Sequence, residues 1–345
     1  MEINPMKLRI VLVFAVLTLA GVIALGQGPR RDVGTNLPLP PATDVPKDAI
    51  RGKPLSVDVD LVPVDVVVAD KNGNLIKGLE KRDFKIFDEN VEQPITNFST
   101  TETPLTVVIM FEFSKTFAYY YDNVFVPIIG FGDSLKDDDW AALVKFDLHT
   151  EIITDFTKNK RQLFANLSDL RFATYSEVVL FDAVYETLTR LDKIEGKKAI
   201  FLVGTGFDTI SRHTYGEVLK KAEGSDTMIY AVSMGQLYRL YTENQRSAFG
   251  NIDFLAADNQ LRSLAAATGG ETFFPRFGSE YPDIYDNISK QLRNQYSLAF
   301  TPANLKKDGK FHKIRVEVAD LDLNKDGKKD GLKARHKRGY YAPKS

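Results

Sequence analysis

The stretch Thr106–Phe111 (TVVIMF) decides the fold. It is an unbroken apolar run, the pattern of a strand that is buried on both faces of a sheet. Runs of the same kind recur at 141–146, 199–203 and 228–232. Helical patterns lie between them, for example at 180–191 and 215–222. Strands that alternate with helices predict a mostly parallel sheet with helices on both faces, that is, a Rossmann-like α/β fold.

Strand patterns of another kind flank this block on both sides. Before it, β-branched runs at 57–68 lead to a hairpin turn at Asp70–Gly73, and short strands are expected at 78–79, 83–87 and 93–98. After it, a helix at 282–293 is followed by strands at 296–300, 313–318 and 332–335. A few strands alone bury little apolar surface. We therefore expect both sets to join in one immunoglobulin-like β-sandwich that the α/β block interrupts, with two separate β pieces as the alternative.

The N-terminus has the layout of a secretory signal peptide. Lys7 and Arg9 precede an apolar run at 10–25, and Ala24 and Gly26 stand at the −3 and −1 positions of a cleavage site. The run is short for a membrane span, which needs about 20 residues. Residues 27–54 contain six prolines and predict an extended linker. We expect export to the periplasm or the exterior. An uncleaved N-terminal anchor is the alternative and would be the sole contact with a membrane.

Composition excludes several classes of function. The 345 residues are 43% hydrophobic and 26% charged, as in globular proteins, and the length suggests about two domains. Forty-five basic and 46 acidic residues give a net charge of −1, which argues against a nucleic-acid partner. The chain has no cysteine, which removes disulfides and thiolate chemistry. None of the four histidines has a metal-ligand partner at i+3 or i+4, and GxSxG and HExxH are absent. We expect a non-catalytic protein; a hydrolase-like enzyme is the third alternative.

Short motifs run in a fixed order through most of the chain: VVVAD at 66–70 with Gly73, GL at 78–79, DF at 83–84, QPI at 93–95 with Phe98, LFDA at 180–183, GFDT at 206–209, QYSL at 295–298 and RGYYAP at 338–343. In order and spacing they resemble the von Willebrand factor A-related (VWFA-related) proteins of Acidobacteria, from Val57 to Ala342. The resemblance implies a Rossmann-like von Willebrand factor A domain, which usually mediates adhesion or complex assembly. The expected divisions are a signal peptide at 1–26, a linker at 27–54, sandwich parts at 55–102 and 294–345, and the A domain at 103–293.

The resemblance also implies a metal-ion-dependent adhesion site (MIDAS) at the carboxyl edge of the sheet, where Mg²⁺ is held by Asp-x-Ser-x-Ser, a Thr and a second Asp. Here the first element reads Glu112-Phe113-Ser114-Lys115-Thr116, Val178 aligns with the Thr, and Thr205 replaces the second Asp. Because two elements lack their ligand, we expect a degenerate, metal-free edge at which Glu112 is solvated or paired with Lys115. The alternative is a weakly held divalent ion on Glu112, Ser114 and Thr116.

Aromatic residues cluster just after the first strand of the α/β block. Tyrosine is favoured at interfaces because it buries a large area and keeps a hydroxyl group. Three consecutive tyrosines on a helix cannot all face one core. We therefore expect a metal-independent partner-binding patch made of Phe113, Phe117, Tyr119, Tyr120 and Tyr121. Packing in the core is the alternative for about half of these residues.

A second cation candidate lies between two C-terminal strands. In Asp322–Asp330, oxygen side chains at positions 1, 3, 5 and 9 and Gly at position 6 match the first part of a calcium loop. The ligands would be Asp322, Asn324, Asp326, the carbonyl of Lys328, and Asp330. The alternative is a plain hairpin tip, since these are also turn residues. If Ca²⁺ binds there, a calcium-stabilised structural protein of the envelope is the alternative function.

Overall fold

The structure is a computed structural model. It describes residues 61–100, 103–115, 121–170, 173–242, 248–303, 307–319, 321, 329 and 331–344. The expected signal peptide and linker lie outside these residues.

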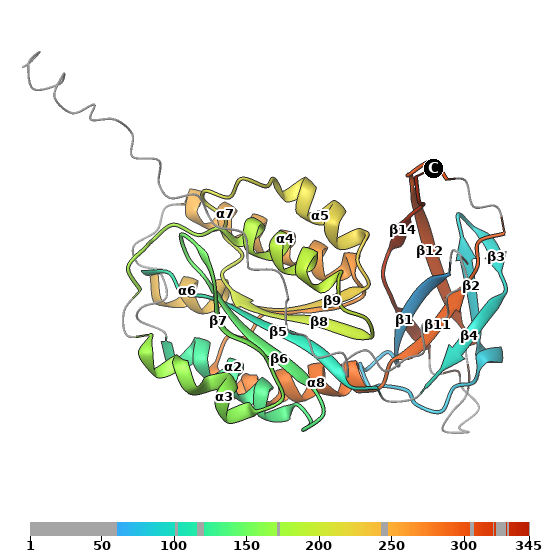
Figure 1. The fold of residues 1–345 in the computed structure, drawn as a ribbon, viewed down its shortest axis with the longest axis horizontal. Coiled ribbons are helices and arrows are strands. Elements are labelled where there is room, and N and C mark those ends of the chain that lie inside the picture. The colour runs from blue at the N-terminus through green and yellow to red at the C-terminus, as the bar shows by residue number, and fades with distance from the viewer. Residues whose placement is uncertain are drawn as a thin grey trace, which may run out of the picture. The chain divides into compact units, whose positions relative to one another are not determined.

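The apolar run that opens the sequence analysis forms the central strand of a six-stranded sheet (Figure 1). This strand, β5 (Leu105–Glu112), is buried at every residue. The strand order is β10-β9-β8-β5-β6-β7. Its other members are β6 (Trp140–Phe146), β7 (Thr150–Thr157), β8 (Lys197–Gly204), β9 (Thr227–Ser233) and β10 (Thr272–Phe273). All pairs are parallel except β6 with β7, so the expected mostly parallel sheet is present.

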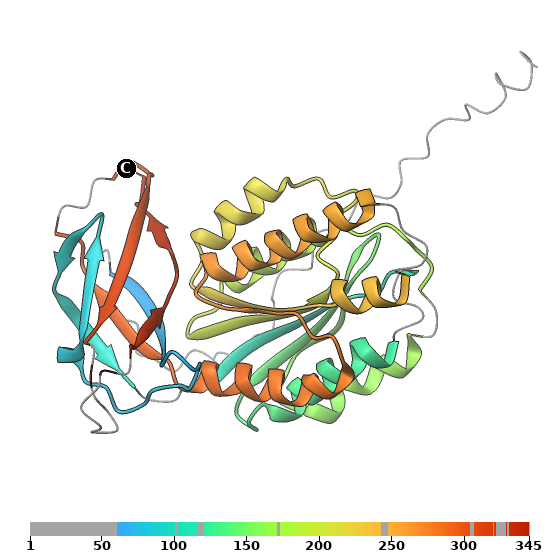
Figure 2. The same cartoon turned by 180° about the vertical axis from the view of Figure 1, so that it is seen from behind.

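Helices cover both faces of this sheet (Figures 1 and 2). One face carries α2 (Tyr121–Ser134), α3 (Lys160–Phe164) with a 3-10 turn at Ala165–Asp169, and α8 (Tyr281–Arg293) after a turn at Gly278–Glu280. The other carries α4 (Leu180–Leu191), α5 (Tyr215–Glu223) and α7 (Ala248–Ala267), while α6 (Gly235–Thr242) follows β9. The predicted helices at 180–191, 215–222 and 282–293 are therefore confirmed to within a residue at each end.

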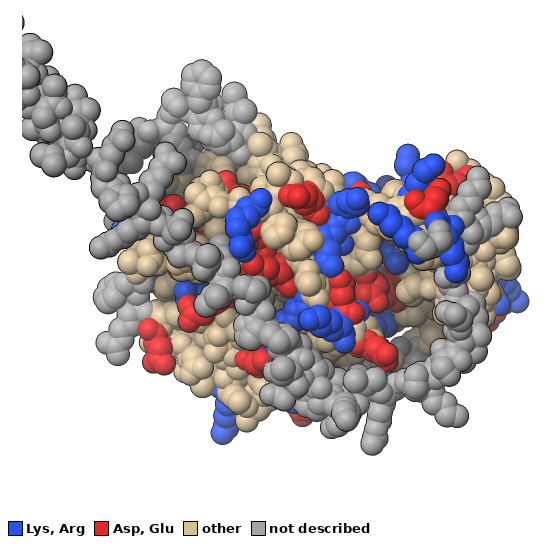
Figure 3. Space-filling view, turned by 45° about the horizontal axis from the view of Figure 1, so that its top comes forward, with Lys and Arg blue, Asp and Glu red and all other residues tan. Residues whose placement is uncertain are grey.

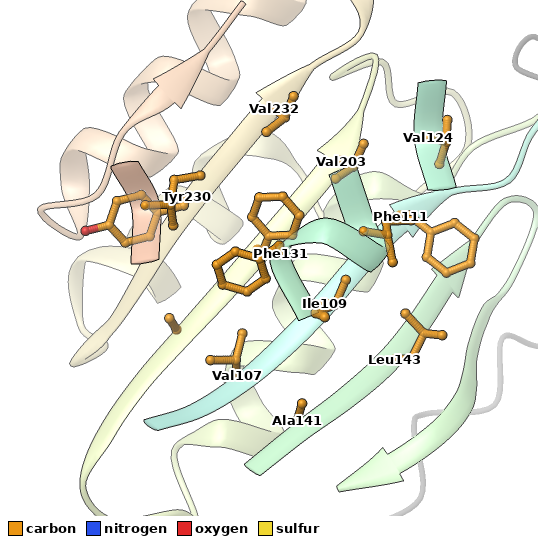
Figure 4. Packing of buried hydrophobic residues seen from close by; sticks show 14 of the residues in the cluster. Val107, Ile109, Phe111, Val124, Phe131, Ala141, Leu143, Val203, Tyr230 and Val232 are labelled. Atoms are coloured by element: carbon orange, nitrogen blue, oxygen red, sulfur yellow. The ribbon is translucent and has the colours of Figure 1, made fainter. Parts of the chain in front are cut away.

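Alternate residues of β5 supply two separate cores, because successive side chains of a strand point to opposite faces. Val107, Ile109 and Phe111 pack on the side of α2 and α8, where Phe131 also lies (Figure 4). Val108 and Met110 pack on the side of α4 and α5. This double burial is why the strand shows no polar alternation.

The remaining strands form two four-stranded antiparallel sheets. One has the order β13 (Lys333–Arg335), β1 (Val62–Ala69), β11 (Tyr296–Phe300), β4 (Ile95–Ser99). The other has the order β14 (Gly339–Tyr341), β12 (Phe311–Val318), β2 (Phe84–Asp88), β3 (Val91–Gln93). Both contribute to one apolar core, for example through Val64, Ile86, Phe300 and Val316. Each sheet thus combines strands from before and after the α/β block, while the immunoglobulin-like assignment stays a prediction.

In the first β block the expected strand at 78–79 is wrong, whereas the expected turn at 70–73 is present. Gly78 and Leu79 form no strand: Gly78 adopts a φ of +80°, and the Leu79 amide donates to Tyr296 Oη at 3.2 Å. Asp70–Gly73 does turn, with the Gly73 amide bonded to the Asp70 carbonyl at 3.1 Å. After the turn Leu75 forms an antiparallel bridge with Ala69, and the Ile76 amide donates to the Val68 carbonyl at 2.9 Å, so the expected hairpin turn is present. A 3-10 turn at Lys81–Asp83 precedes β2 instead.

The C-terminal segment fastens the sandwich to the α/β block. Arg335 Nη1 pairs with Glu271 at 2.6 Å and its Nε donates to the Gly269 carbonyl at 3.1 Å. The Arg338 amide donates to the Ala267 carbonyl at 3.0 Å. Gly269 has a φ of +83°, and a Cβ on it would lie 2.8 Å from the His336 carbonyl carbon. The close approach of the two backbones therefore requires glycine at this position.

Candidate functional site

The centre of the parallel sheet contains a topological switch point. The chain leaves β5 through α2 on one face, whereas α4 and α5, which precede and follow β8, lie on the other. Such a point opens a crevice at the carboxyl ends of the two strands, where ligands bind in α/β sheets. Glu112 ends β5, Ser114 follows it, and Thr205 follows β8. The structure therefore brings together three of the four candidate ligands of the metal site. Thr116 lies outside the described residues.

Glu112 is a buried hydrogen-bond acceptor at the carboxyl end of β5. Its side chain accepts from Ser114 Oγ at 2.7 Å, from Thr205 Oγ at 2.6 Å and from the Thr205 amide at 2.8 Å. The residue is 2% exposed, and in the described part of the chain no ion pair joins it to Lys115. The expectation of a solvated or Lys115-paired Glu112 is therefore wrong, because the hydroxyl groups that follow β5 and β8 surround the carboxyl group.

The residues described here do not fit the magnesium site that the resemblance implies. Burial raises the pKa of Glu112 above its usual range, although its hydrogen bonds from Thr205 and Ser114 act in the opposite direction. A divalent cation needs charged oxygen ligands that are free to coordinate it, whereas both oxygens of Glu112 are engaged. Val178 offers no side-chain oxygen, and its amide donates to Thr209 Oγ at 2.7 Å. Within the described ranges no three His, Asp or Glu side chains lie close enough to hold a metal ion.

A second buried carboxylate shapes the loop after β8. Asp182, in the first turn of α4, is 0% exposed. It accepts from the amides of Arg212 at 3.1 Å and His213 at 2.9 Å, and from His213 Nδ1 at 2.6 Å. Burial alone would raise its pKa, but the hydrogen bonds from His213 and Arg212 outweigh burial and lower it. Asp182 thus folds the loop 205–214 back onto α4. The sequence motif LFDA contained this residue, yet nothing in the motif showed that it is an acceptor.

The irregular segment 173–179 is bonded to three neighbouring loops at the same edge. The Lys115 amide donates to the Tyr175 carbonyl at 2.7 Å, and the Val179 amide donates to the Asp147 carbonyl at 2.9 Å. The Thr209 amide donates to the Val178 carbonyl at 2.8 Å. The loops after β5, β6 and β8 are therefore held together through one segment. A surface fixed in this way loses little conformational entropy when it binds.

This edge exposes apolar and basic side chains. We define the edge surface as residues 113–115, 147–149, 173–179, 205–214 and 274–277. Tyr175 is 39% exposed, Ile210 46% and Phe277 64%. Within the edge surface the exposed cations are Lys115, Arg212 and Arg276, and the exposed acid is Glu177. Sequence reasoning missed Tyr175 and Ile210, because a single apolar residue in a polar loop carries no periodic signal.

The predicted aromatic patch is only partly described. Phe113 is 4% exposed, and its ring centroid lies 6.3 Å from that of Phe111 and 5.9 Å from Lys145 Nζ. Its proposed role as an exposed contact residue is wrong, because the ring belongs to the core under the crevice. Phe117, Tyr119 and Tyr120 lie outside the described residues, and Tyr121 begins α2 with a side chain that is not described. The calcium candidates Asp322, Asn324, Asp326, Lys328 and Asp330 also lie outside them.

No protein-family model matches this sequence, and no curated protein matches it. The chain is similar to solved structures of von Willebrand factor A domain proteins. One is a von Willebrand factor type A protein from Catenulispora acidiphila (10% identity, 81% of this chain and 74% of that one, TM-score 0.44). Another is the vWF domain of the type V pili tip protein Mfa5 from Porphyromonas gingivalis (12% identity, 55% of this chain and 95% of that one, TM-score 0.41). A third is the conserved hypothetical protein BatB from Bacteroides thetaiotaomicron (16% identity, 54% of this chain and 98% of that one, TM-score 0.40). At these values the likenesses say nothing about what this chain binds, and membership of the Acidobacterial family stays a prediction.

Proposed function

We propose that this chain is an exported, non-catalytic binding protein that presents the carboxyl edge of its parallel sheet to a protein partner. The observation that carries the proposal is the edge surface, on which Tyr175 and Ile210 stand exposed on loops that are hydrogen-bonded to one another. Export rests on the N-terminal leader pattern. No helix among the described residues is long and apolar enough to cross a membrane.

The polar groups at the edge support a binding role over a catalytic one. Glu112 and Asp182 are occupied by hydrogen bonds within the loops. Asp208 accepts from the Phe181 amide at 3.0 Å and from Ser211 Oγ at 2.5 Å, so it too holds the loop to α4. A general base or nucleophile needs a side chain that is free to reach a substrate. These three carboxyl groups instead stabilise the shape of the surface.

The charges of the edge surface favour a partner with an acidic and apolar face. Arg212 pairs with Asp182 and Glu186 at 3.3 Å each, which leaves the exposed Lys115 and Arg276 against the exposed Glu177 there. The N-termini of α4 and α5 also point to this edge and add partial positive charge. By contrast, basic and acidic side chains are intermixed over the face shown in Figure 3, without a large patch of one sign. The positive character is therefore local, and it suits a protein surface rather than a polynucleotide.

Replacing Tyr175 or Ile210 by Ser should weaken partner binding by about tenfold or more for each change, as expected of anchor residues in an interface. The partner would be captured from envelope extract on the immobilised mature protein and purified, and its Kd measured by titration calorimetry. Val91→Ser is the matched control, because Val91 is 57% exposed on β3 of the sandwich. Equal Kd values for wild type, Tyr175→Ser and Ile210→Ser would contradict the proposal.

Reversing the charge of Lys115 or Arg276 should slow association with the same partner. Complementary charges mainly raise the association rate, and salt screens them. We expect Lys115→Glu and Arg276→Glu to lower the rate constant by about threefold to tenfold at low salt and to flatten its salt dependence. Lys71→Glu, in the exposed turn before β2, is the control. Stopped-flow or surface-plasmon measurements at two salt concentrations test this; a faster association of the Glu variants would contradict an acidic partner.

A further inference from the structure

We infer that the side chain of Glu112 takes the place of a metal ion at the carboxyl edge, by tying the loop after β5 to the loop after β8, so that the edge keeps its shape without a divalent cation. The importance of this connection between the two loops for partner binding rests on the proposed function. The tie itself is testable without a partner.

The first argument is the position of Glu112 at the end of the strand ladder. The register of β5 with β8 ends at the pair Phe111 and Val203. Beyond that pair the two chains separate toward opposite faces of the sheet. There Glu112 Oε1 accepts from Ser114 and Oε2 accepts from both donors of Thr205. One side chain therefore continues the connection between the strands past the point where the backbone hydrogen bonds stop.

The second argument is the fit between the glutamate and its surroundings. A Cβ on Gly204 would lie 3.2 Å from Glu112 Cβ and 3.2 Å from its Oε2. Glycine at this position leaves the space that the carboxyl group occupies. An aspartate at position 112 is one methylene shorter, and its carboxyl group would fall short of Thr205 while still meeting Ser114. The reach of a glutamate is thus matched to the opposite loop.

The third argument is that a cation would have to displace hydrogen bonds that the site already satisfies. Ser114 and Thr205 direct their hydroxyl protons at Glu112, and Thr205 Oγ accepts from the Phe207 amide at 3.2 Å. The nearby acid Asp147 pairs with Lys145 at 3.3 Å. Glu112 is 2% exposed and already has three donors, so it offers a cation no free carboxylate oxygen.

The test is thermal unfolding of the full chain in 5 mM MgCl₂, 5 mM MnCl₂ or 5 mM EDTA. We expect wild type to show the same midpoint in all three solutions. Glu112→Gln keeps an acceptor for Thr205 and a donor for Ser114, and should shift the midpoint by less than about 2 °C. Glu112→Asp and Glu112→Ala leave buried donors unsatisfied and should lower it by about 4–10 °C. Glu92→Gln is the control and should not shift it, because Glu92 pairs with Lys85 on the sandwich and both side chains are more than half exposed.

The inference is overturned if Mg²⁺ or Mn²⁺ raises the wild-type midpoint and Glu112→Gln abolishes that rise, because a bound ion stabilises the folded state. It is also overturned if Glu112→Asp unfolds at the wild-type midpoint, since the length of the side chain would then be irrelevant. Neither result touches the proposed function, which fails only if the Tyr175 and Ile210 variants bind the partner like wild type.

Discussion

Replacing Asp139 by Ala should lower the free energy of unfolding by about 3–5 kcal/mol. The Asp139 side chain is 0% exposed and pairs with Arg293, at the end of α8, whose side chain is 10% exposed. One of its two hydrogen bonds to that guanidinium measures 3.2 Å. It also accepts from the Leu105 amide at 2.9 Å and the Lys136 amide at 2.7 Å. The Ala variant would leave a buried cation and two amides without a partner.

The position of Asp139 adds to the expected effect. Leu105 begins β5, where the chain enters the α/β block from the sandwich, and Arg293 ends α8, where it returns to β11. Asp139 therefore hydrogen-bonds to both segments that connect the sandwich with the α/β block. Urea unfolding followed by circular dichroism measures the change, with Asp286→Ala as the control. Asp286 and its partner Lys290 are both more than half exposed, and such pairs contribute less than about 1 kcal/mol. Equal losses for both variants would contradict the prediction.

Replacing Asp182 by Asn should cost about 2–4 kcal/mol, because buried donors lose their charged acceptor. The amides of Arg212 and His213 both donate to this carboxylate, as does His213 Nδ1. An Asn side chain keeps one oxygen and turns an NH₂ group toward the remaining donors. Amide hydrogen exchange should speed up at residues 212 and 213 before it changes in β8. Unchanged exchange there would show that the loop does not depend on Asp182.

The same residue predicts a pH dependence. The folded-state pKa of Asp182 lies below its ordinary value of 3.8. Its share of stability is therefore complete above that value and is lost as the pH falls through the folded-state pKa. The difference in unfolding free energy between wild type and Asp182→Asn should shrink as the pH falls below about 4. A difference that grows as the pH falls would contradict the lowered pKa.

Periodicity predicted the fold where burial is complete. The run at 107–111 has no polar residue because both of its faces are covered, so the sequence predicted a strand there. The helix at 180–191 was equally clear. The sequence pattern did not predict the irregular loop at Gly78 and Leu79. There the Leu79 amide donates to the hydroxyl group of Tyr296, which is 217 residues away in the chain. Contacts of that range depend on tertiary packing and leave no mark on the local sequence.

At the candidate site, too, some features could be predicted from the sequence and others depend on tertiary packing. The family resemblance implied that Ser114 and Thr205 share one edge, and in the structure both hydroxyl groups donate to Glu112. The sequence did not show that the Glu112 side chain is buried, because a glutamate at the end of a strand can face either solvent or a buried hydroxyl group. Tyr175 and Ile210 were invisible for a related reason: their exposure follows from how three loops are bonded together. Only the assembled backbone gives that information.

The insertion of the α/β block between β4 and β11 has a consequence for the order of folding. β1 pairs with β11 and β2 pairs with β12, so neither sandwich sheet can close until strands from beyond residue 296 have been synthesised. The pairs within the inserted sheet join much nearer neighbours along the chain. Low sequence separation favours early formation. On a ribosome or a translocation channel, the inserted block can therefore become structured while β1, β4 and the outer edge of the β2–β3 pair still lack their partner strands, and a chaperone would recognise such unpaired edges.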